Sequence, residues 1–269
     1  MFPRISGLGS PGPHLLLPWS DAKDTTIMGR QFEPSLTDRE IGNPGKDFWS
    51  PECRLVVFAL ASTSIMSLLV EFCVLGSMRA FTFLVSLPAL VGLLAWALFD
   101  REIGSQRLWR AIVVGSLAGL VAAVAYDMFR LPFVFARELG IERIVPPLQL
   151  FKVFPRFGAM VLGQPMEQSH YSALTQLVGW AYHFSNGITF GIMYLALVGD
   201  ADKRHWTWAV LFAAGLELGM LFTPYAKFFG IALTTKFVVV TLAAHVVFGA
   251  IMGLVALGLS KLLTPSAYR

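Results

Sequence analysis

Residues 80–99 read AFTFLVSLPALVGLLAWALF, twenty consecutive residues without a charge. A helix of about 20 apolar residues is what the ~30 Å hydrocarbon core of a bilayer requires. The rest of the chain agrees: 55% of its 269 residues are hydrophobic, only 14% are charged, and the mean hydropathy is +0.63. Soluble domains carry about 25% charged residues, so the charges here are too few to cover a soluble surface. The composition predicts an integral membrane protein and excludes a typical cytosolic enzyme, a disordered protein and a disulfide scaffold.

Five further apolar segments, together with this one, predict an all-α membrane protein with six transmembrane helices. The segments lie at about 55–77, 80–99, 109–129, 173–198, 206–226 and 237–260. Short linkers between several of them favour antiparallel neighbours, and an even number of spans places both termini on one side. Ten Lys and Arg residues flank the spans on the terminal side and eight on the other, so the positive-inside rule favours cytoplasmic termini.

The chain divides into three parts by composition. Residues 1–54 hold 13 of the 38 charged residues and seven of the 15 prolines, which predicts a mostly disordered polar segment; Met28 is an alternative start to Met1. Residues 55–99 form two peripheral transmembrane helices, and residues 109–260 form the main bundle. The connector at about 131–171 mixes aromatic and basic residues, which is typical of an amphipathic segment in the headgroup region. It is either a lid, a lipid-binding element or a plain interfacial connector.

The last four spans share a glycine pattern that the first two lack. Each contains two glycines four residues apart, a spacing that lets transmembrane helices pack closely. The pairs are Gly115/Gly119, Gly187/Gly191, Gly215/Gly219 and Gly249/Gly253. His183 and His245 each stand four residues before such a pair. We therefore predict a glycine-packed bundle of two repeated helical hairpins, 109–198 and 206–260.

The segment GSLAGLVAA at 115–123, the His183-bearing span and the sequence AHVVFG at 244–249 resemble the YagU-like family of uncharacterised bacterial inner-membrane proteins. The resemblance covers roughly residues 109–260 and leaves the first two spans outside. It implies a multi-pass protein of the bacterial inner (plasma) membrane. It implies no reaction and no ligand.

Ionisable and amide side chains within the spans are the candidate functional residues, because each costs free energy in hydrocarbon. They are Asp127, Arg130, His183, Asn186, Glu217 and His245. Asp127 and Arg130 are three residues apart, which places them on one helix face as a local ion pair, or as a gate or anion-binding arginine. Glu217 lies between two glycines and projects from the opposite face. It is the best candidate for binding a proton or a cation.

The paired histidines allow three roles besides simple hydrogen bonding between helices. His183 and His245 can carry protons, because imidazole titrates near neutral pH. They can ligate a transition metal, with Asn186 or a carboxylate as an outer partner. They can also be the two axial ligands of a haem. No cofactor is the leading expectation, with haem or a metal as the alternative.

Three functions remain open from the sequence. The bundle moves protons, a cation or a small solute; or the protein is a non-catalytic scaffold or stress-response protein; or it is a bis-histidine redox protein. The chain contains no nucleophile elbow, HExxH helix or phosphate-binding loop, so it resembles no enzyme with a known signature. Its expected partner is the lipid bilayer and not nucleic acid, and its helix faces are compatible with a homo-oligomer.

Overall fold

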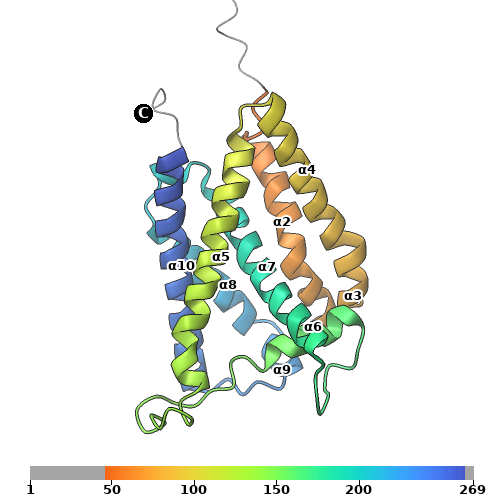
Figure 1. The fold of residues 1–269 in the computed structure, drawn as a ribbon, viewed down its shortest axis with the longest axis vertical. Helices are drawn as coiled ribbons and strands as arrows, with labels where there is room; N and C mark the ends of the chain where they lie inside the picture. The colour runs from red at the N-terminus through yellow and green to blue at the C-terminus, as the bar shows by residue number, and fades with distance from the viewer. Residues whose placement is uncertain (1–45, 264–269) are drawn as a thin grey trace, which may run out of the picture. The chain divides into compact units, whose positions relative to one another are not determined.

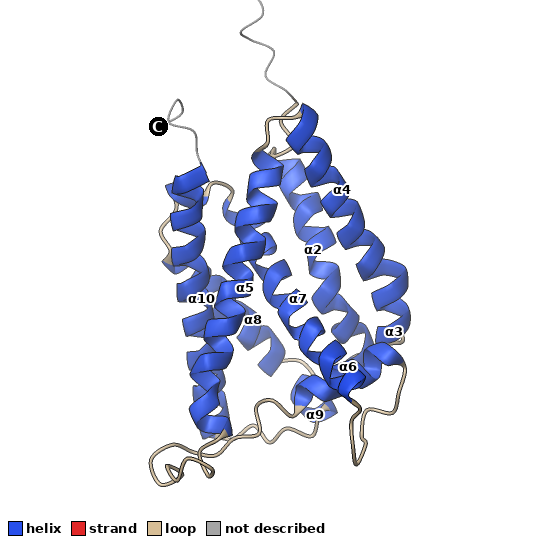
Figure 2. Cartoon of the chain, in the orientation of Figure 1, coloured by secondary structure: helices blue, strands red, loops and turns tan. Residues whose placement is uncertain are grey.

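The computed structural model describes residues 46–263, and within them the regular elements are helices joined by loops, with no strand (Figure 2). The predicted disorder of the N-terminal segment falls mainly on residues 1–45, which lie outside the described residues. An isolated bridge joins Lys46 to Gly104. In chain order the elements are α2 (Pro51–Phe72), α3 (Met78–Phe81), the π-helical turn η2 (Thr82–Ser86), α4 (Leu87–Ile103), α5 (Arg107–Val134), α6 (Val153–Leu162), α7 (Ala173–Val198), the 3-10 turn η3 (Ala201–Lys203), α8 (Thr207–Leu221), α9 (Tyr225–Phe228) and α10 (Thr235–Leu263).

Side chains at the helix ends explain where two of the long helices begin. The hydroxyl of Ser172 accepts a hydrogen bond from the backbone N–H of Thr175 at 3.1 Å, which caps the first turn of α7. Asp100, fully buried in the last turns of α4, accepts the N–H of Trp109 at 2.9 Å. A carboxylate at a helix N-terminus satisfies free N–H groups and faces the positive end of the helix dipole. Asp100 thereby fixes the turn between α4 and α5.

Among the described residues, four helices are long and apolar enough to cross a membrane: Pro51–Phe72, Met78–Ile103, Arg107–Val134 and Thr235–Leu263. The other two predicted spans fall short of this standard. Helix α7 has sufficient length but carries polar residues such as Gln176, His183 and Asn186. Helix α8 has 15 residues, or about 22 Å at 1.5 Å per residue, and ends at Leu221, three residues before Pro224. The structure therefore supports a multi-pass helical protein with four clear spans.

Helices α5 and α7 lie at the centre of the bundle (Figure 1). Helix α5 packs against α4, α7 and α10, while α7 also contacts α2 and α6. Within its most apolar window, the stretch Met78–Ile103 is only 17% buried, against 44% for both Arg107–Val134 and Thr235–Leu263. The α3–α4 stretch is therefore the least buried of these, whereas α2, which the sequence analysis grouped with it, makes buried polar contacts with α7.

The glycines of α5 and α7 bring the two backbones into direct contact. A Cβ added to Gly119 would lie 2.1 Å from the carbonyl oxygen of Gly187, and one on Gly191 would lie 2.0 Å from that of Gly115. Real Cβ atoms essentially never approach so closely. Glycine at these positions therefore allows a helix contact that any larger residue would push apart.

The glycine contacts of the C-terminal hairpin differ from this arrangement. Gly249 and Gly253 of α10 face the start of α8, where an added Cβ would lie 2.6 Å from the Ala209 carbonyl oxygen and 2.5 Å from that of Trp206. By contrast, an added Cβ at Gly215 or Gly219 of α8 would meet no atom within 4 Å. The expectation that this pair packs against another helix is wrong, because the face of α8 that carries it is open.

The connector between α5 and α7 also differs from the interfacial segment that its composition suggests. Helix α5 continues through Pro132 to Val134. Later in the connector, the ten residues Val153–Leu162 form α6. Eight of the ten residues of α6 are buried. An added Cβ at Gly158 would lie 1.8 Å from the Thr175 carbonyl oxygen. Phe154 and Phe157 of α6 thus fill the bundle, whereas Phe135 earlier in the connector is 44% exposed.

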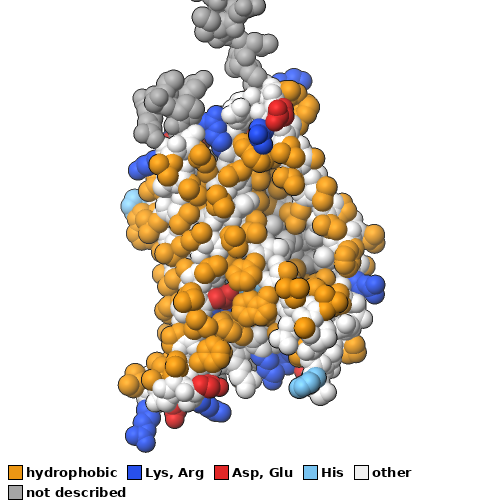
Figure 3. Space-filling model, in the orientation of Figure 1, with side chains coloured by type: hydrophobic (Ala, Val, Ile, Leu, Met, Phe, Trp, Pro, Cys, Tyr) orange, Lys and Arg blue, Asp and Glu red, His pale blue; other side chains and the backbone are white. Residues whose placement is uncertain are grey.

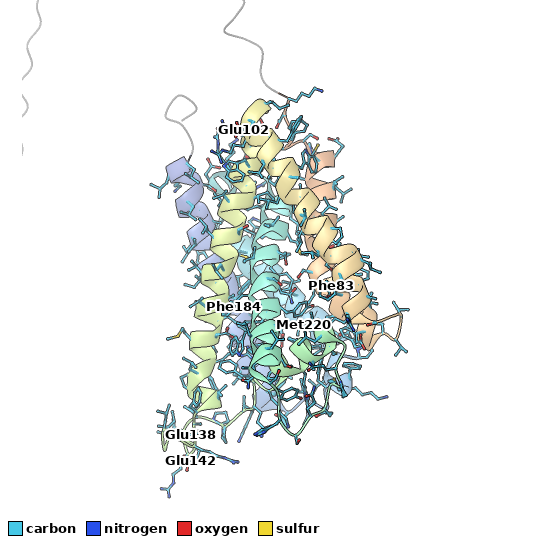
Figure 4. All side chains as sticks on the ribbon, turned by 45° about the vertical axis from the view of Figure 1, so that its right-hand side comes forward. Phe83, Glu102, Glu138, Glu142, Phe184 and Met220 are labelled. Carbon is cyan, nitrogen blue, oxygen red and sulfur yellow. The ribbon has the colours of Figure 1, made fainter. Side chains whose placement is uncertain are left out.

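The outer surface of the bundle matches a protein surrounded by lipid. On the face shown in Figure 3, hydrophobic side chains cover the middle, whereas most basic and acidic side chains lie towards the two ends. Glu102 lies at one end and Glu138 and Glu142 at the other (Figure 4). Large apolar side chains such as Leu84 and Leu211 are 76% and 63% exposed. Exposed apolar area of this extent indicates contact with a membrane.

Candidate functional site

Four helices bring the polar residues predicted from the sequence into one region of the bundle. Helix α5 contributes Asp127 and Arg130, α7 contributes His183 and Asn186, α8 contributes Glu217, and α10 contributes His245. Glu217, Arg130, Asp127 and His245 are between 3% and 9% exposed. Buried ionisable groups at membrane depth require partners, and each of these four has one.

Asp127 holds two partners at once. Its Oδ1 lies 3.3 Å from Nη1 of Arg130, and its Oδ2 lies 2.9 Å from Nε2 of His183. The contact with Arg130 is the one expected from the three-residue spacing along α5. The contact with His183 joins α5 to α7 just beyond the glycine crossing. A carboxylate oxygen only accepts hydrogen bonds, so in this contact Nε2 of His183 is the donor.

Arg130 is held in a cage of aromatic rings and a backbone carbonyl. Its Nη2 donates to the carbonyl oxygen of Leu150 at 2.6 Å. Its guanidinium carbon lies 4.6 Å from the ring centre of Tyr126 and 5.1 and 5.5 Å from those of Phe151 and Phe154. A desolvated guanidinium over aromatic faces is stabilised by about 2 kcal/mol or more. Leu150, Phe151 and Phe154 of the segment between α5 and α7 therefore stabilise the guanidinium of Arg130.

His245 and Glu217 form the second carboxylate–imidazole pair. Nδ1 of His245 lies 2.9 Å from the Thr241 carbonyl oxygen and 3.2 Å from Oε2 of Glu217. A carbonyl oxygen only accepts hydrogen bonds, so Nδ1 carries the hydrogen and Nε2 is the basic nitrogen of the neutral ring. His245 thus contacts both an acceptor within its own helix and a carboxylate of α8.

Tyr126 lies between the two pairs. Its ring centre is 5.0 Å from that of His245 and 6.1 Å from that of His183. Both imidazoles line a cavity of about 100 Å³, which has room for about three water molecules. Tyr126, Arg130 and Asn186 add polar groups to its wall. His183 and His245 thus line one cavity, and Glu217 is not among the residues of its wall.

A second cavity of about 410 Å³ adjoins the first. The residues that line both cavities are Tyr126, Arg130, Val153, Met220 and Tyr225. Met220 is labelled in Figure 4. Glu217 lines the larger cavity, whereas the two imidazoles line the smaller one. The Glu217–His245 contact thus connects the two cavities through the protein.

Asn186, considered above as an outer partner of metal-binding histidines, is hydrogen-bonded to a serine of α2. Its Oδ1 accepts a hydrogen bond from the hydroxyl of Ser64 on α2 at 2.7 Å. The Tyr182 hydroxyl donates to the Ser64 carbonyl oxygen at 3.0 Å. These bonds connect α2 to α7 in the bundle core. Asn186 also lines the smaller cavity, so its side chain both fixes α2 and borders the site.

The haem hypothesis does not fit this site. The cavity that both imidazoles line measures about 100 Å³, while even small-molecule pockets measure about 300–1,000 Å³. The ring of Tyr126 also contacts both imidazoles. Among residues 46–263, no three His, Cys, Asp or Glu side chains are grouped to hold a metal ion.

Two further site residues could not be selected from the sequence. Arg156 of α6 is buried, donates from Nη1 to the Phe229 carbonyl oxygen at 2.7 Å and pairs with Glu167 at 2.7 Å. Thr241 provides the carbonyl that fixes the hydrogen of His245. Arg156 lies among the basic and aromatic residues of the connector, and its burial depends on the unexpected packing of α6. A backbone acceptor leaves no signal in the sequence.

Comparisons with known proteins provide no relative whose site could be compared with this one. No family model, no curated protein and no solved structure matches this chain. The resemblance to YagU-like inner-membrane proteins therefore stays an expectation, carried by the glycine and histidine positions alone. The observations that bear on function are the two carboxylate–imidazole pairs and the two adjoining cavities.

Proposed function

We propose that this chain is a multi-pass inner-membrane protein whose bundle at 109–260 binds protons and transfers them while moving a small solute. One observation carries the proposal: two carboxylate–imidazole pairs, Asp127–His183 and Glu217–His245, flank Tyr126 at a water-sized cavity. Ionisable residues within transmembrane segments commonly belong to ion pathways and proton relays. Imidazole is the side chain suited to exchange protons near neutral pH.

The geometry supports a balanced proton transfer at each pair. Nε2 of His245 takes up a proton from water in the smaller cavity, and the ring becomes an imidazolium. Nδ1 then gives its hydrogen to Oε2 of Glu217, 3.2 Å away, which leaves a neutral ring and a protonated carboxyl. Glu217 releases that proton into the larger cavity. His183 takes up a proton at Nδ1 and returns it from the same nitrogen, while its Nε2 hydrogen stays bonded to Asp127 at 2.9 Å.

The two pairs have different tasks in this proposal. Asp127 is neutralised by Arg130 at 3.3 Å, so it serves to orient His183 and to stabilise its charged form. Glu217 contacts the imidazole of His245 at 3.2 Å, a partner that is charged only when it is protonated. A carboxylate with one titrating partner changes its own charge more readily than one held by a guanidinium. Glu217 is therefore the group that gains and loses the proton in each cycle.

The membrane arrangement belongs to the same proposal. The chain has six spans when α7 and the broken helix α8–α9 cross the bilayer beside the four apolar helices. Both termini then lie on one side, which the positive-inside rule assigns to the cytoplasm. Helix α8 is broken before α9 (Tyr225–Phe228), and broken helices are tolerated at membrane depth where they line a cavity. Internal repeats and discontinuous helices recur in transporters, with the binding site near the membrane centre.

Proton flux into sealed vesicles tests this function. We expect purified protein in liposomes that contain a pH-sensitive dye to show flux driven by an imposed pH gradient. E217Q and H183A are expected to reduce the rate at least tenfold, because each removes a proton-binding group. E138Q, at an exposed end of the bundle (Figure 4), is the matched control and retains the rate.

The outcome also separates the other two functions. Flux that persists unchanged in E217Q and H183A contradicts the proposal. The scaffold function is the correct one if vesicles with wild-type protein show no flux and if alanine variants of His183, Glu217 and His245 rescue a deletion phenotype. A Soret band or a stoichiometric metal in active protein would support the redox function.

A further inference from the structure

The larger cavity carries an excess of positive charge that the proton relay does not use. Arg130, Arg156 and Lys152 line it together with the carboxylate of Glu217. Asp127 pairs with Arg130 at 3.3 Å, so among the described residues the positive charges on this wall without a buried carboxylate partner are those of Arg156 and Lys152. Both arginines are more than nine-tenths buried. Placing two guanidiniums in a membrane bundle is costly unless their charge is matched. The partner carboxylate of Arg156, Glu167, has a side chain that is 64% exposed, so water screens that pairing.

The two guanidiniums also keep hydrogen-bonding capacity. Each has five N–H groups. The Nη atoms of Arg130 contact Asp127 and Leu150, and those of Arg156 contact Phe229 and Glu167. Within the described part of the chain, Nε of both arginines has no partner. An additional oxyanion could satisfy N–H groups of both side chains.

The rest of the cavity wall is apolar. The buried or half-buried apolar residues along it include Leu150, Val153, Met220, Phe229, Ile231 and Phe237. The outer rim contains exposed residues, among them Gln149 and Lys152 on one side and Thr234 on the other. A volume of about 410 Å³ falls within the range of small-molecule pockets. The wall therefore suits a molecule with one charged end and an apolar body.

We infer that this cavity binds an amphiphilic anion, with its carboxylate or phosphate between Arg130 and Arg156 and its apolar body along the inner wall. The inference rests on the proposed function and names the class of solute. Such an anion has two sources, a soluble fatty carboxylate or the headgroup of an anionic lipid, and both use the same chemistry.

Glu217 couples this anion to the proton. The charged and titratable groups around it are Arg130 and Tyr126 from α5, Arg156 from α6, Tyr225 from α9 and His245 from α10, with Lys152 at the rim. An ionised Glu217 repels an anion in the same cavity, and a protonated Glu217 does not. Anion binding is therefore tighter when Glu217 carries its proton, so the anion and the proton move together.

Equilibrium dialysis with labelled octanoate tests the soluble source. The protein is held in nanodiscs of phosphatidylcholine, and binding to empty nanodiscs is subtracted. We expect saturable binding that is tighter at about pH 6 than at about pH 8, because a proton taken up at the Glu217–His245 pair lowers the negative charge beside the anion. R156Q should weaken binding about tenfold, because it removes a charge-assisted contact. E217Q should bind tightly at both pH values.

Matched lysine variants keep the test valid if R156Q fails to fold. Lys152 lines the cavity, whereas Lys227 is exposed but does not line it. K152Q is expected to weaken octanoate binding about threefold through loss of a screened charge, and K227Q to leave it unchanged. Equal affinities for wild type, R156Q and K152Q, or the absence of saturable binding to any anion tested, overturn the inference.

Native mass spectrometry tests the lipid source. Protein extracted from membranes that contain phosphatidylglycerol and phosphatidylcholine should retain phosphatidylglycerol, and K152Q should retain less than K227Q. Octanoate binding without lipid retention assigns the site to soluble anions, and the reverse assigns it to lipid headgroups. Both measurements work without a proton gradient, so failure of the flux experiment does not remove the anion site, and failure of the anion site does not abolish flux.

Discussion

The two buried carboxylates of the site differ in what surrounds them. Asp127 contacts Arg130 and His183 at 3.3 and 2.9 Å, whereas the ion-pair contact of Glu217 is with His245 at 3.2 Å. A buried charge that loses its partner costs several kcal/mol. Removing Asp127 therefore leaves an unpaired guanidinium, while removing the charge of Glu217 leaves an imidazole that can become neutral. The first change affects stability and the second affects proton transfer.

The variant D127A tests this difference through the stability of the fold. We expect it to lower the free energy of unfolding by about 3–5 kcal/mol, the usual effect of breaking a buried ion pair. Denaturant unfolding in detergent, followed by tryptophan fluorescence, gives the value. E142Q, at an exposed position (Figure 4), is the control. An unfolding midpoint for D127A equal to that of E142Q would show that Arg130 does not depend on Asp127.

At the scale of residues, the sequence predicts local contacts better than contacts between helices. The three-residue spacing of Asp127 and Arg130 is sufficient to predict their pairing. The pairing of His183 with Asp127 depends on the rotation of α7 against α5, which the glycine positions indicate only in outline. The contact of His245 with the Thr241 carbonyl uses a backbone acceptor, which leaves no signal in the sequence. The position of Arg156 depends on α6 and could not be predicted.

At the scale of helices, glycines with the same spacing in the sequence differ in whether another helix packs against them. Gly119 of α5 and Gly219 of α8 both belong to pairs with the same spacing. An added Cβ would lie 2.1 Å from the Gly187 carbonyl oxygen at the first, and would meet nothing within 4 Å at the second. Spacing alone therefore predicts a small-residue face but not whether another helix covers it.

The pair G119A and G219A tests this packing with one chemical change. G119A should destabilise the protein by about 1–3 kcal/mol, the usual cost of inserting a methyl group into a filled contact. G219A should be neutral or stabilise it by up to about 1 kcal/mol, because alanine is the better helix former. The difference between their thermal unfolding midpoints in detergent checks the claim. Equal midpoints would contradict close contact between α5 and α7.

The lengths of α6 and α8 show where an apolar pattern is ambiguous. The segment at 206–226 is long enough to predict a span, yet α8 ends at Leu221 and Pro224 precedes α9. The missing N–H of proline explains the break. The segment that becomes α6 is short and rich in aromatic residues, so its composition suits an interface as well as a core. Burial by a neighbouring helix decides between them, and it is a tertiary property.

At the scale of the whole molecule, polar contacts fix one end of the bundle outside the apolar spans. Arg107 binds Asp47 at 2.8 Å and Asp200 at 3.1 Å, and Lys203 binds Asp200 at 2.8 Å. Burial alone would raise the pKa of Asp200, but hydrogen bonds from Lys203 and Arg107 lower it below its ordinary value. The carboxylate is thus ionised at neutral pH and joins the α7–α8 turn to the start of α5.

The class of the protein could be predicted from composition, whereas the site could not. Charges are too few for a soluble surface, and on the face shown in Figure 3 most of the charged side chains that are described lie towards the two ends of the bundle. Which of the remaining ionisable residues meet depends on the order in which helices pack. The sequence predicts the candidates, and the structure brings Asp127, Arg130, His183, Glu217 and His245 to adjoining cavities.

The central claim is that Glu217 carries an exchangeable proton, and infrared difference spectroscopy measures this directly. A pH jump on protein in lipid should produce a carbonyl-stretch band of a protonated carboxyl group, which shifts in heavy water. The account predicts that the band disappears in E217Q and remains in E138Q. A band that persists in E217Q, or no carboxyl band in the wild-type protein, would contradict it.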